Sequence, residues 1–293
     1  MIKFSLPGYY INKDVLLFFA FLQQEHPEVF IENRRFDSAY DLPPDLIWNG
    51  GRVSFDHSID PSDWDYLAKD YQDKDIALRH TCTNQLLDER HFTDPLCNDW
   101  MRICENKNNS VIVYSEEFAN YIKTNYPDYN IIYSTTRTAT DLNTINQLSK
   151  DNLVVLNYNK NHDEKYLQAL QYPQNVEILC AELCVPNCPC RNDHYKYISA
   201  HQLRQRLPGQ TAFKCPFDKE NALLSFYDSL TLPHGITNEY VDELYNTYGI
   251  ANFKISGRRA VPIFVIEAIC YYLIKPEMRD FVRQNALLHA YYR

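Results

Sequence analysis

Glycine is scarce in this sequence, which has seven glycines among 293 residues. No glycine-rich loop of the kind that surrounds nucleotide phosphates is present, so nucleotide binding through such a loop is not expected. A chain with so few glycines keeps them where the backbone needs a positive φ or approaches another group closely. Two loops therefore become candidates for a binding site, WNGGR at 48–52 and SGR at 256–258, although ordinary turns would explain the same residues.

Long hydrophobic segments and an excess of basic residues are also missing. The apolar run VLLFFAFL at 15–22 is too short to span a bilayer, and the N-terminus shows no basic stretch followed by a long apolar one. We therefore expect a cytoplasmic protein with no membrane segment. Lys and Arg number 29 against 38 Asp and Glu, a net charge of −9. This excludes broad, nonspecific binding to nucleic acid but not an RNA substrate in a local basic cleft.

Several catalytic motifs are absent as well. The sequence contains no serine nucleophile elbow, no His-Glu zinc helix and no triplet of closely spaced cysteines typical of radical enzymes. A hydrolytic mechanism would need a nucleophile or a hydrolytic metal, and the sequence supplies neither plainly. A peptidase is therefore a weak alternative on the residues alone.

Short β-rich runs alternate with helical patterns along the whole chain. The predicted strands are 2–6, 35–40, 76–82, 110–115, 130–135, 153–158, 176–182 and 252–257, and the predicted helices are 13–26, 94–105, 115–126, 141–150, 163–172 and 262–274. Such alternation predicts parallel strands joined by right-handed crossovers. Eight strands favour a closed α/β architecture, a (β/α) TIM-type barrel that forms one domain over 1–293. The less regular segment 191–250 is expected to be an insertion or lid before the last strand.

The barrel predicts where functional side chains gather, because active residues of such folds lie at the C-terminal ends of the strands. The candidate substrate-binding residues are Trp48, Asn49, Arg52, Arg137 and Asn157. The catalytic candidates are Arg258, which follows the last strand, and His194, which is suited to relay protons or to hydrogen-bond a sulfur. Arg52, Arg137 and Arg258 are expected to hold an anionic part of the substrate. Solvated loop residues, and for Trp48 a cap on the barrel, are the simpler readings.

Cysteine, in contrast to glycine, is concentrated in one place. Four of the nine cysteines lie in CAELCVPNCPC at 180–190. The odd total and the expected cytoplasmic location argue against a disulfide framework and favour metal ligands or catalytic thiols. Pro186 and Pro189 shape a loop around Cys184 and Cys188, and Cys215 also lies beside a proline. These three thiols are the first candidates for metal ligands.

A fourth ligand is expected from elsewhere in the chain, because a thiolate site of this kind takes about four cysteines. Cys97 is the choice, since it begins a predicted helix whose dipole favours a thiolate. Cys82, Cys180 and Cys190 are alternatives, although Cys180 fits a buried strand position and Cys190 lies very close to Cys188. The isolation of positions 97 and 215 does not match the two close pairs of a zinc ribbon. Spacing alone leaves both zinc and an iron–sulfur cluster open.

The segment NFKISGRRAVPIFVIEAICYYLI at 252–274 resembles a motif of the collagenase-like (U32) peptidase family. There a strand ending in Lys-Ile-Glu-Gly-Arg precedes a helix with aromatic residues; here Ser256 stands at the position of the Glu. The resemblance implies an N-terminal (β/α) barrel, Arg258 at its mouth, and a 4Fe–4S cluster. The ligands of that cluster would be Cys97, Cys184, Cys188 and Cys215.

The resemblance also implies a function. Family members of this kind carry out oxygen-independent hydroxylation or a related modification of an organic or RNA substrate. The expected partners are therefore a small-molecule or RNA substrate, and an electron-transfer or homologous partner protein. A noncatalytic binding protein with structural zinc on the same cysteines is one alternative, and a peptidase is the other.

Overall fold

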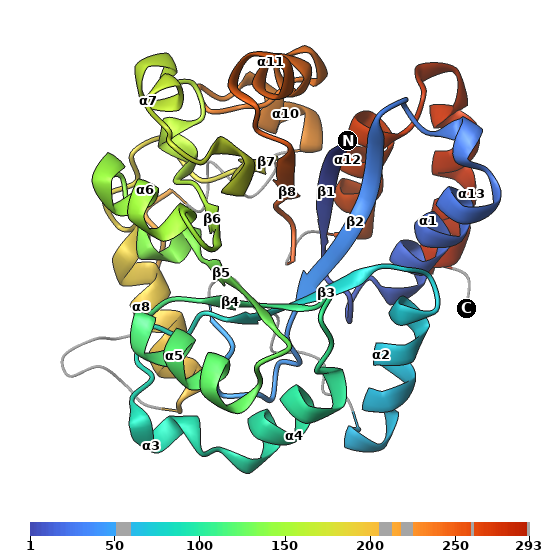
Figure 1. The fold of residues 1–293 in the computed structure, drawn as a ribbon. Helices are drawn as coiled ribbons and strands as arrows, with labels where there is room; N and C mark the ends of the chain where they lie inside the picture. Colours follow the sequence, from blue (N-terminus) through green and yellow to red (C-terminus); the bar gives the residue numbers. More distant parts are fainter. Residues whose placement is uncertain (51–59, 205–212, 218–224, 259–260, 292–293) are drawn as a thin grey trace.

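Eight parallel strands close into a barrel in chain order, with β1 paired to both β2 and β8 (Figure 1). The computed structural model describes residues 1–50, 60–204, 213–217, 225–258 and 261–291. The strands are β1 (Ile2–Pro7), β2 (Arg34–Asp41), β3 (Ala77–Cys82), β4 (Ser110–Val113), β5 (Asn130–Tyr133), β6 (Leu153–Val155), β7 (Val176–Cys180) and β8 (Asn252–Ile255). The predicted TIM-type barrel is confirmed, and each strand begins within one residue of its predicted start.

Side chains alternate between the inside of the barrel and the surrounding helices, as the pleat of a strand requires. On the outer face, the rings of Phe4 on β1 and Phe253 on β8 stack at 5.4 Å, and Phe4 also stacks on Tyr272 of a covering helix at 5.6 Å. Phe253 therefore points outward, and its neighbour Lys254 points into the barrel. The alternation along β8 therefore places the charged side chain of Lys254 inside the barrel.

Two separate hydrophobic cores result from this alternation. A small one fills the barrel and consists of Tyr40, Ile112, Ile132 and Val155. A much larger one lies between the outer strand faces and the helices. The interior of the barrel is thus only partly apolar, and its remaining positions carry polar and charged side chains.

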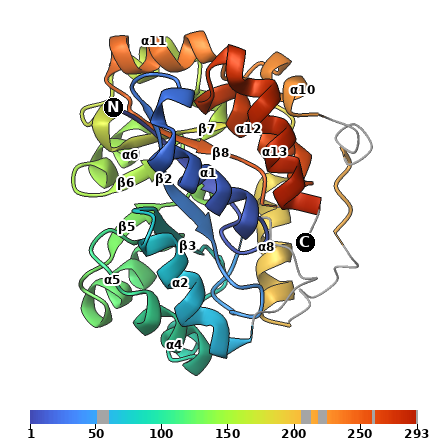
Figure 2. The same cartoon turned by 90° about the vertical axis from the view of Figure 1, so that its right-hand side faces the viewer.

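Helices surround the barrel, as Figures 1 and 2 show from two sides. They are α1 (Lys13–Glu25), α2 (Trp64–Gln72), α3 (Glu89–Phe92), α4 (Pro95–Cys104), α5 (Glu116–Asn125), α6 (Leu142–Ser149), α7 (Glu164–Gln168), α8 (Arg191–Gln202), α10 (Phe226–Thr231), α11 (Asn238–Tyr248), α12 (Pro262–Leu273) and α13 (Arg279–Tyr291). Helices α1, α12 and α13 pack together (Figure 2). Within the described ranges, no helix is both long and apolar enough to cross a membrane.

Side-chain caps explain where several helices begin. Ser115 accepts a hydrogen bond from the backbone N–H of Phe118, and Asp141 accepts one from Thr144. Both residues stand at the first position of a helix range predicted from the sequence, and both are of types that commonly cap helices. Between β7 and β8 stand α8, α10 and α11, in the segment predicted to be an irregular helical insertion. Helix α11 ends at Gly249, whose φ of 73° closes the helix in the left-handed conformation.

Gly50 lies where two chain segments approach each other too closely for a side chain. A Cβ atom at this position would be 2.4 Å from the backbone nitrogen of Asn84 and 2.4 Å from the carbonyl carbon of Thr83. The presence of glycine at position 50 is thus explained by the packing of this loop against the end of β3. Its neighbour Gly51 lies outside the described residues.

Replacing Gly50 by Ala is expected to lower the free energy of unfolding by about 3 kcal/mol, because backbone atoms must move to admit the methyl group. Gly249→Ala is the matched control. Space is open there, with the nearest atom 3.8 Å away, and only the left-handed φ is unfavourable. That variant should lose about 1 kcal/mol. Urea unfolding of the two variants and the wild type measures both, and equal losses would contradict the packing argument.

Candidate functional site

A cavity of about 430 Å³ opens at the C-terminal mouth of the barrel. Its lining includes residues that directly follow the strand ends, among them Thr83 after β3, Ser134 after β5, Ala181 after β7 and Ser256 after β8. This volume lies in the range of small-molecule sites. The predicted location of the site at the strand ends therefore coincides with a real cavity.

Four partly exposed thiols line this cavity, namely those of Cys184, Cys188, Cys190 and Cys215. The other five cysteines are buried: Cys82, Cys97, Cys104, Cys180 and Cys270. Burial raises the pKa of each of these five thiols, which suits inert core residues. The structure thus divides the nine cysteines cleanly into a cavity group and a core group.

The loop that carries three of the cavity thiols has a strained start. Ala181, the first residue after β7, has a φ of 56°, and Asn187 has a φ of 51°. Both lie in the left-handed region that non-glycine residues rarely adopt. The backbone N–H of Asn187 donates to the side chain of Asn159 at 2.8 Å, which fixes this bend. Such strain persists only where surrounding contacts enforce it, and it is typical of functional loops.

Glu182 holds the thiol loop to the helix that follows it. One oxygen of its carboxylate accepts from the backbone N–H of Cys184 at 2.9 Å, and the other accepts from Arg191 at 3.1 Å. The guanidinium of Arg191 lies 4.4 Å from the ring centroid of Tyr158, whose hydroxyl donates to the carbonyl of Val185 at 2.8 Å. The loop is therefore anchored at both its backbone and its flanking side chains.

Arg191 is nevertheless incompletely satisfied. It is 6% exposed, and its Nε and Nη1 atoms have no hydrogen-bond partner among the described residues. Its positive charge interacts with Cys184, which together with Glu182 helps to raise the pKa of the guanidinium. Buried donors without acceptors are costly. An anionic group beside the thiols would supply the missing acceptors.

The cavity thiols lie near one another without forming a compact ligand set. Burial raises the pKa of Cys188, as does its proximity to Cys184, whereas the backbone N–H of Cys190 lowers it by hydrogen-bonding to the sulfur. Among the described residues, no three His, Cys, Asp or Glu side chains are arranged so as to hold a metal ion. The four thiols thus line the cavity without converging on one point within it.

Arg258 reaches back from the end of β8 to the loop that contains Asn49. It donates to the hydroxyl of Thr81 at 2.6 Å, to the side-chain oxygen of Asn49 at 3.2 Å and to the carbonyl of Gly50 at 2.8 Å. Asp41 lies 3.8 Å away, and burial raises its pKa to about 6 although the guanidinium opposes this shift. Asn49 and Arg258, which the sequence offered as separate candidates, are thus in direct contact.

Lys254 also lines the cavity, from inside the barrel. Its Nζ is 3.7 Å from the ring centroid of Tyr40, and the side chain is 7% exposed. Burial lowers the pKa of this amine to about 7, Glu177 opposes the shift, and Arg79 and Arg258 add to it. Glu177 is fully buried and forms a short ion pair with Arg79. The interior of the barrel therefore contains a lysine whose pKa is lowered toward neutrality.

Cys97 does not join the cavity thiols. It is fully buried in the large core, close to the backbone of Trp48, on helix α4. The helix N-terminus was expected to favour its thiolate, but burial and the nearby Asp94 raise its pKa instead. Cys97 points into the core and is not among the residues that line the cavity. Cys190 is the cysteine that lines the cavity together with Cys184, Cys188 and Cys215.

Most of the remaining substrate candidates face away from the cavity. Trp48 is 1% exposed and packs edge-on against Phe118 in the core, which leaves no ring face for a ligand. Arg137 donates to the carbonyl of Tyr114 at 2.6 Å and lies over the ring of Tyr133. The side chain of Asn157 caps the short helical turn that follows it. All three are explained by local structure.

Two other candidates have different outcomes. His194 lines the cavity, and its ring stacks on Phe213 with centroids 4.7 Å apart. Arg52 lies outside the described residues. Lys254, Glu182 and Tyr40 were not proposed from the sequence. The strict alternation in NFKIS at 252–256 contained the signal for Lys254, because one face of that strand is apolar and the other polar.

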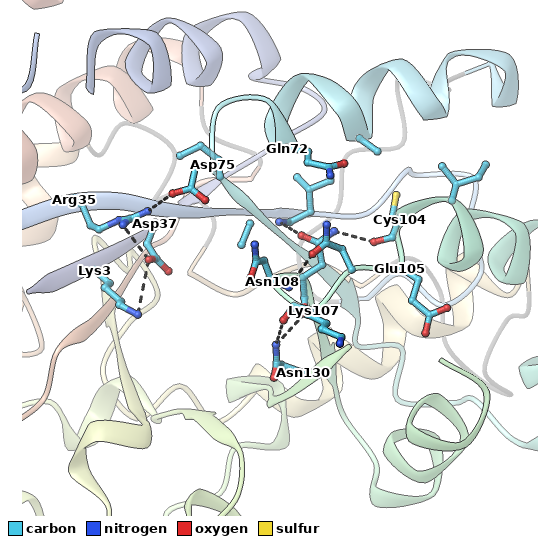
Figure 3. A pocket seen from close by; sticks show the side chains of 17 residues that line it. Lys3, Arg35, Asp37, Gln72, Asp75, Cys104, Glu105, Lys107, Asn108 and Asn130 are labelled. Carbon is cyan, nitrogen blue, oxygen red and sulfur yellow. Dashed lines mark hydrogen bonds and ion pairs between the residues drawn. The ribbon is translucent and has the colours of Figure 1, made fainter. Parts of the chain in front are cut away.

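A second cavity, of about 400 Å³, lies at the opposite end of the barrel (Figure 3). Its charged side chains pair with one another: Asp37 lies 3.9 Å from Lys3 and 3.5 Å from Arg35, and Asp75 lies 3.5 Å from Arg35. Asn109, in the same lining, accepts from the backbone N–H of Leu78 at 2.8 Å. Polar groups at the N-terminal face of a barrel usually serve stability, and these satisfy each other.

Comparisons with known proteins bear on the fold alone. No protein-family model matches the sequence, and no curated protein matches it. Among solved structures, the chain is similar to that of the U32 peptidase Mk0906, with a TM-score of 0.51 and 10% sequence identity over 88% of this chain and 94% of that one. The match covers nearly both chains, so it extends to the whole barrel. The fold implied by the motif at 252–274 is therefore confirmed: this chain has the barrel fold of a U32 peptidase.

Proposed function

We propose that this protein is an iron–sulfur enzyme in which Cys184, Cys188, Cys190 and Cys215 hold a 4Fe–4S cluster at the barrel mouth. The observation that carries the proposal is the presence of four partly exposed thiols on one cavity while the other five cysteines are buried. A cubane cluster binds one thiolate at each iron, so its ligands surround a volume. Cys190 takes the place that the sequence had assigned to Cys97.

The neighbouring charges fit an anionic group of this kind. A cluster with four thiolates carries negative charge, and Arg191 offers two buried N–H groups that no described residue accepts. Glu182 and Tyr158 hold that guanidinium in place. When bound, such a cluster supplies one-electron chemistry beside the cavity. The role of the chain's own residues is to position the thiols and to balance their charge.

The substrate is proposed to be a small anionic organic molecule. Arg258 and Lys254 both line the cavity, and the volume of about 430 Å³ suits one small molecule. The modification is proposed to proceed without oxygen, as the resemblance at 252–274 implies. An RNA substrate, which is the alternative, would have to approach a chain with a net charge of −9. Binding of RNA with a steep salt dependence would favour that alternative.

Metal and sulfide analysis of anaerobically purified protein tests the cluster. About four irons and four acid-labile sulfides per chain are expected, with a brown colour. Zinc without sulfide would replace the proposal by its alternative, a binding protein with structural zinc on the same thiols. Protein purified without any metal, and unable to take up iron and sulfide on reconstitution, would contradict both.

A further inference from the structure

Lys254 is the most unusual charged residue that the proposed cluster leaves unused. Within the described part of the chain, its Nζ has neither a hydrogen-bond partner nor a carboxylate within ion-pair distance. The contact it does make is with the face of Tyr40, at 3.7 Å. The side chain is 93% buried, yet it borders an open cavity. A buried amine with no polar partner and an open path to a cavity is placed to meet a ligand.

The groups that face Lys254 set its charge. Glu177 on the adjacent strand β7 is the acidic neighbour, but its carboxylate is already paired with Arg79. Arg79 on β3 and Arg258 after β8 are the cationic neighbours, and both lower the pKa of the amine. Burial is the largest cause of its lowered pKa of about 7. The amine is therefore a usable nucleophile at neutral pH, unlike an exposed lysine.

Arg258 provides a place for an anionic group near this amine. Its guanidinium lies 6.0 Å from the ring centroid of the same Tyr40. Asp41, at 3.8 Å, is the carboxylate nearest to it in the described residues and titrates with a pKa of about 6. The guanidinium donates to uncharged oxygens of three residues, and no carboxylate of the described residues lies within hydrogen-bond distance of it.

We propose that Lys254 is a reactive amine that condenses with a small carbonyl compound carrying a carboxylate, which Arg258 binds. The lone pair of Nζ attacks the carbonyl carbon, and the carbonyl oxygen takes up a proton to give a carbinolamine. Loss of water then gives an imine between Lys254 and the substrate carbon. No electrons are exchanged in this step. It goes beyond the proposed iron–sulfur function and does not depend on a cluster.

Trapping with glyoxylate and cyanoborohydride tests this proposal on the full chain. Hydride addition to the imine converts it to a stable carboxymethyl amine, which peptide mass mapping locates. At about pH 7, Lys254 should be labelled about a hundredfold faster than Lys69, which is 68% exposed. The rate at Lys254 should level off above about pH 7, whereas the rate at Lys69 should keep rising. Labelling of Lys254 no faster than Lys69 overturns the proposal, and no variant that might misfold is required.

Two further comparisons sharpen the result. Glycolaldehyde has the size of glyoxylate but no charge. The ratio of the labelling rate at Lys254 to that at Lys69 should therefore be about tenfold lower with glycolaldehyde than with glyoxylate. Equal relative rates would overturn the role of Arg258. Iron content is measured on the same samples, and Lys254 should be labelled at the same rate whether or not a sample holds iron. Failure of the cluster and failure of the reactive amine are therefore distinguishable.

Discussion

Replacement of Cys184 or Cys188 by Ser should abolish the brown colour and remove most of the iron from the protein. Each of these thiols lines the cavity, and Cys184 lies close enough to Cys188 to help burial raise the pKa of the Cys188 thiol. A serine hydroxyl is a poor ligand for iron, so loss of either thiolate removes one of four attachment points. The measurement is iron and sulfide per chain in each variant, purified anaerobically under the same conditions.

The controls use cysteines of the core group. Cys104→Ala and Cys270→Ala remove thiols that are at most 2% exposed, so they should keep the iron and lose only some stability. Cys97→Ala is the more informative control, because the sequence had placed this residue among the ligands. It should keep the iron, whereas Cys190→Ser should lose it. The reverse result for these two variants would restore the original ligand set.

The second large effect is expected inside the barrel. Glu177→Gln should lower the free energy of unfolding by about 3 kcal/mol, because it leaves the buried guanidinium of Arg79 with only the more distant carboxylate of Asp37, 3.8 Å away. Arg79→Met should cost a similar amount, since it leaves a fully buried carboxylate. The double variant should lose less than the sum of the two, because the buried charges disappear together. Urea unfolding at neutral pH measures all three.

A surface pair provides the contrast. Lys69 and Asp73 are exposed and lie four residues apart on α2, so Lys69→Met should leave stability nearly unchanged. Glu177→Gln has a second consequence that is specific to the site. Because Glu177 raises the pKa of Lys254, its removal should lower that pKa further. The pH at which glyoxylate labelling levels off should then fall below that of the wild type. An unchanged pH profile would show that Glu177 does not influence the pKa of Lys254.

The fold was predictable from the sequence because strands and helices leave strong, regular signals. Apolar β-rich runs separated by amphipathic helical stretches gave the eight strands and their parallel order, and the caps at Ser115 and Asp141 marked two helix starts. Helices α2, α3 and α13 were not predicted. On α13, Phe281 and Leu288 remain exposed in the structure, so an apolar stripe does not mark its buried face clearly.

The site was predictable only in part, because the spacing of residues along the sequence does not tell whether a loop side chain points into the cavity or into the core. The cysteine-rich segment follows the end of β7 as predicted, whereas the contact between Asn49 and Arg258 was not predicted. Trp48 and Cys97 lie away from the cavity for a shared reason. Trp48 is in a loop and Cys97 is on α4, and both side chains point into the large hydrophobic core. Lys254 was missed although alternation in its strand contained the signal.

Diffraction at the iron absorption edge, from crystals grown without oxygen, tests the central claim most directly. An anomalous peak is predicted in the cavity at the barrel mouth, with iron bonded to the sulfurs of Cys184, Cys188, Cys190 and Cys215. The guanidinium of Arg191 should lie beside it. An iron peak next to Cys97 in the core, or a zinc peak in the cavity without any iron, would contradict the account.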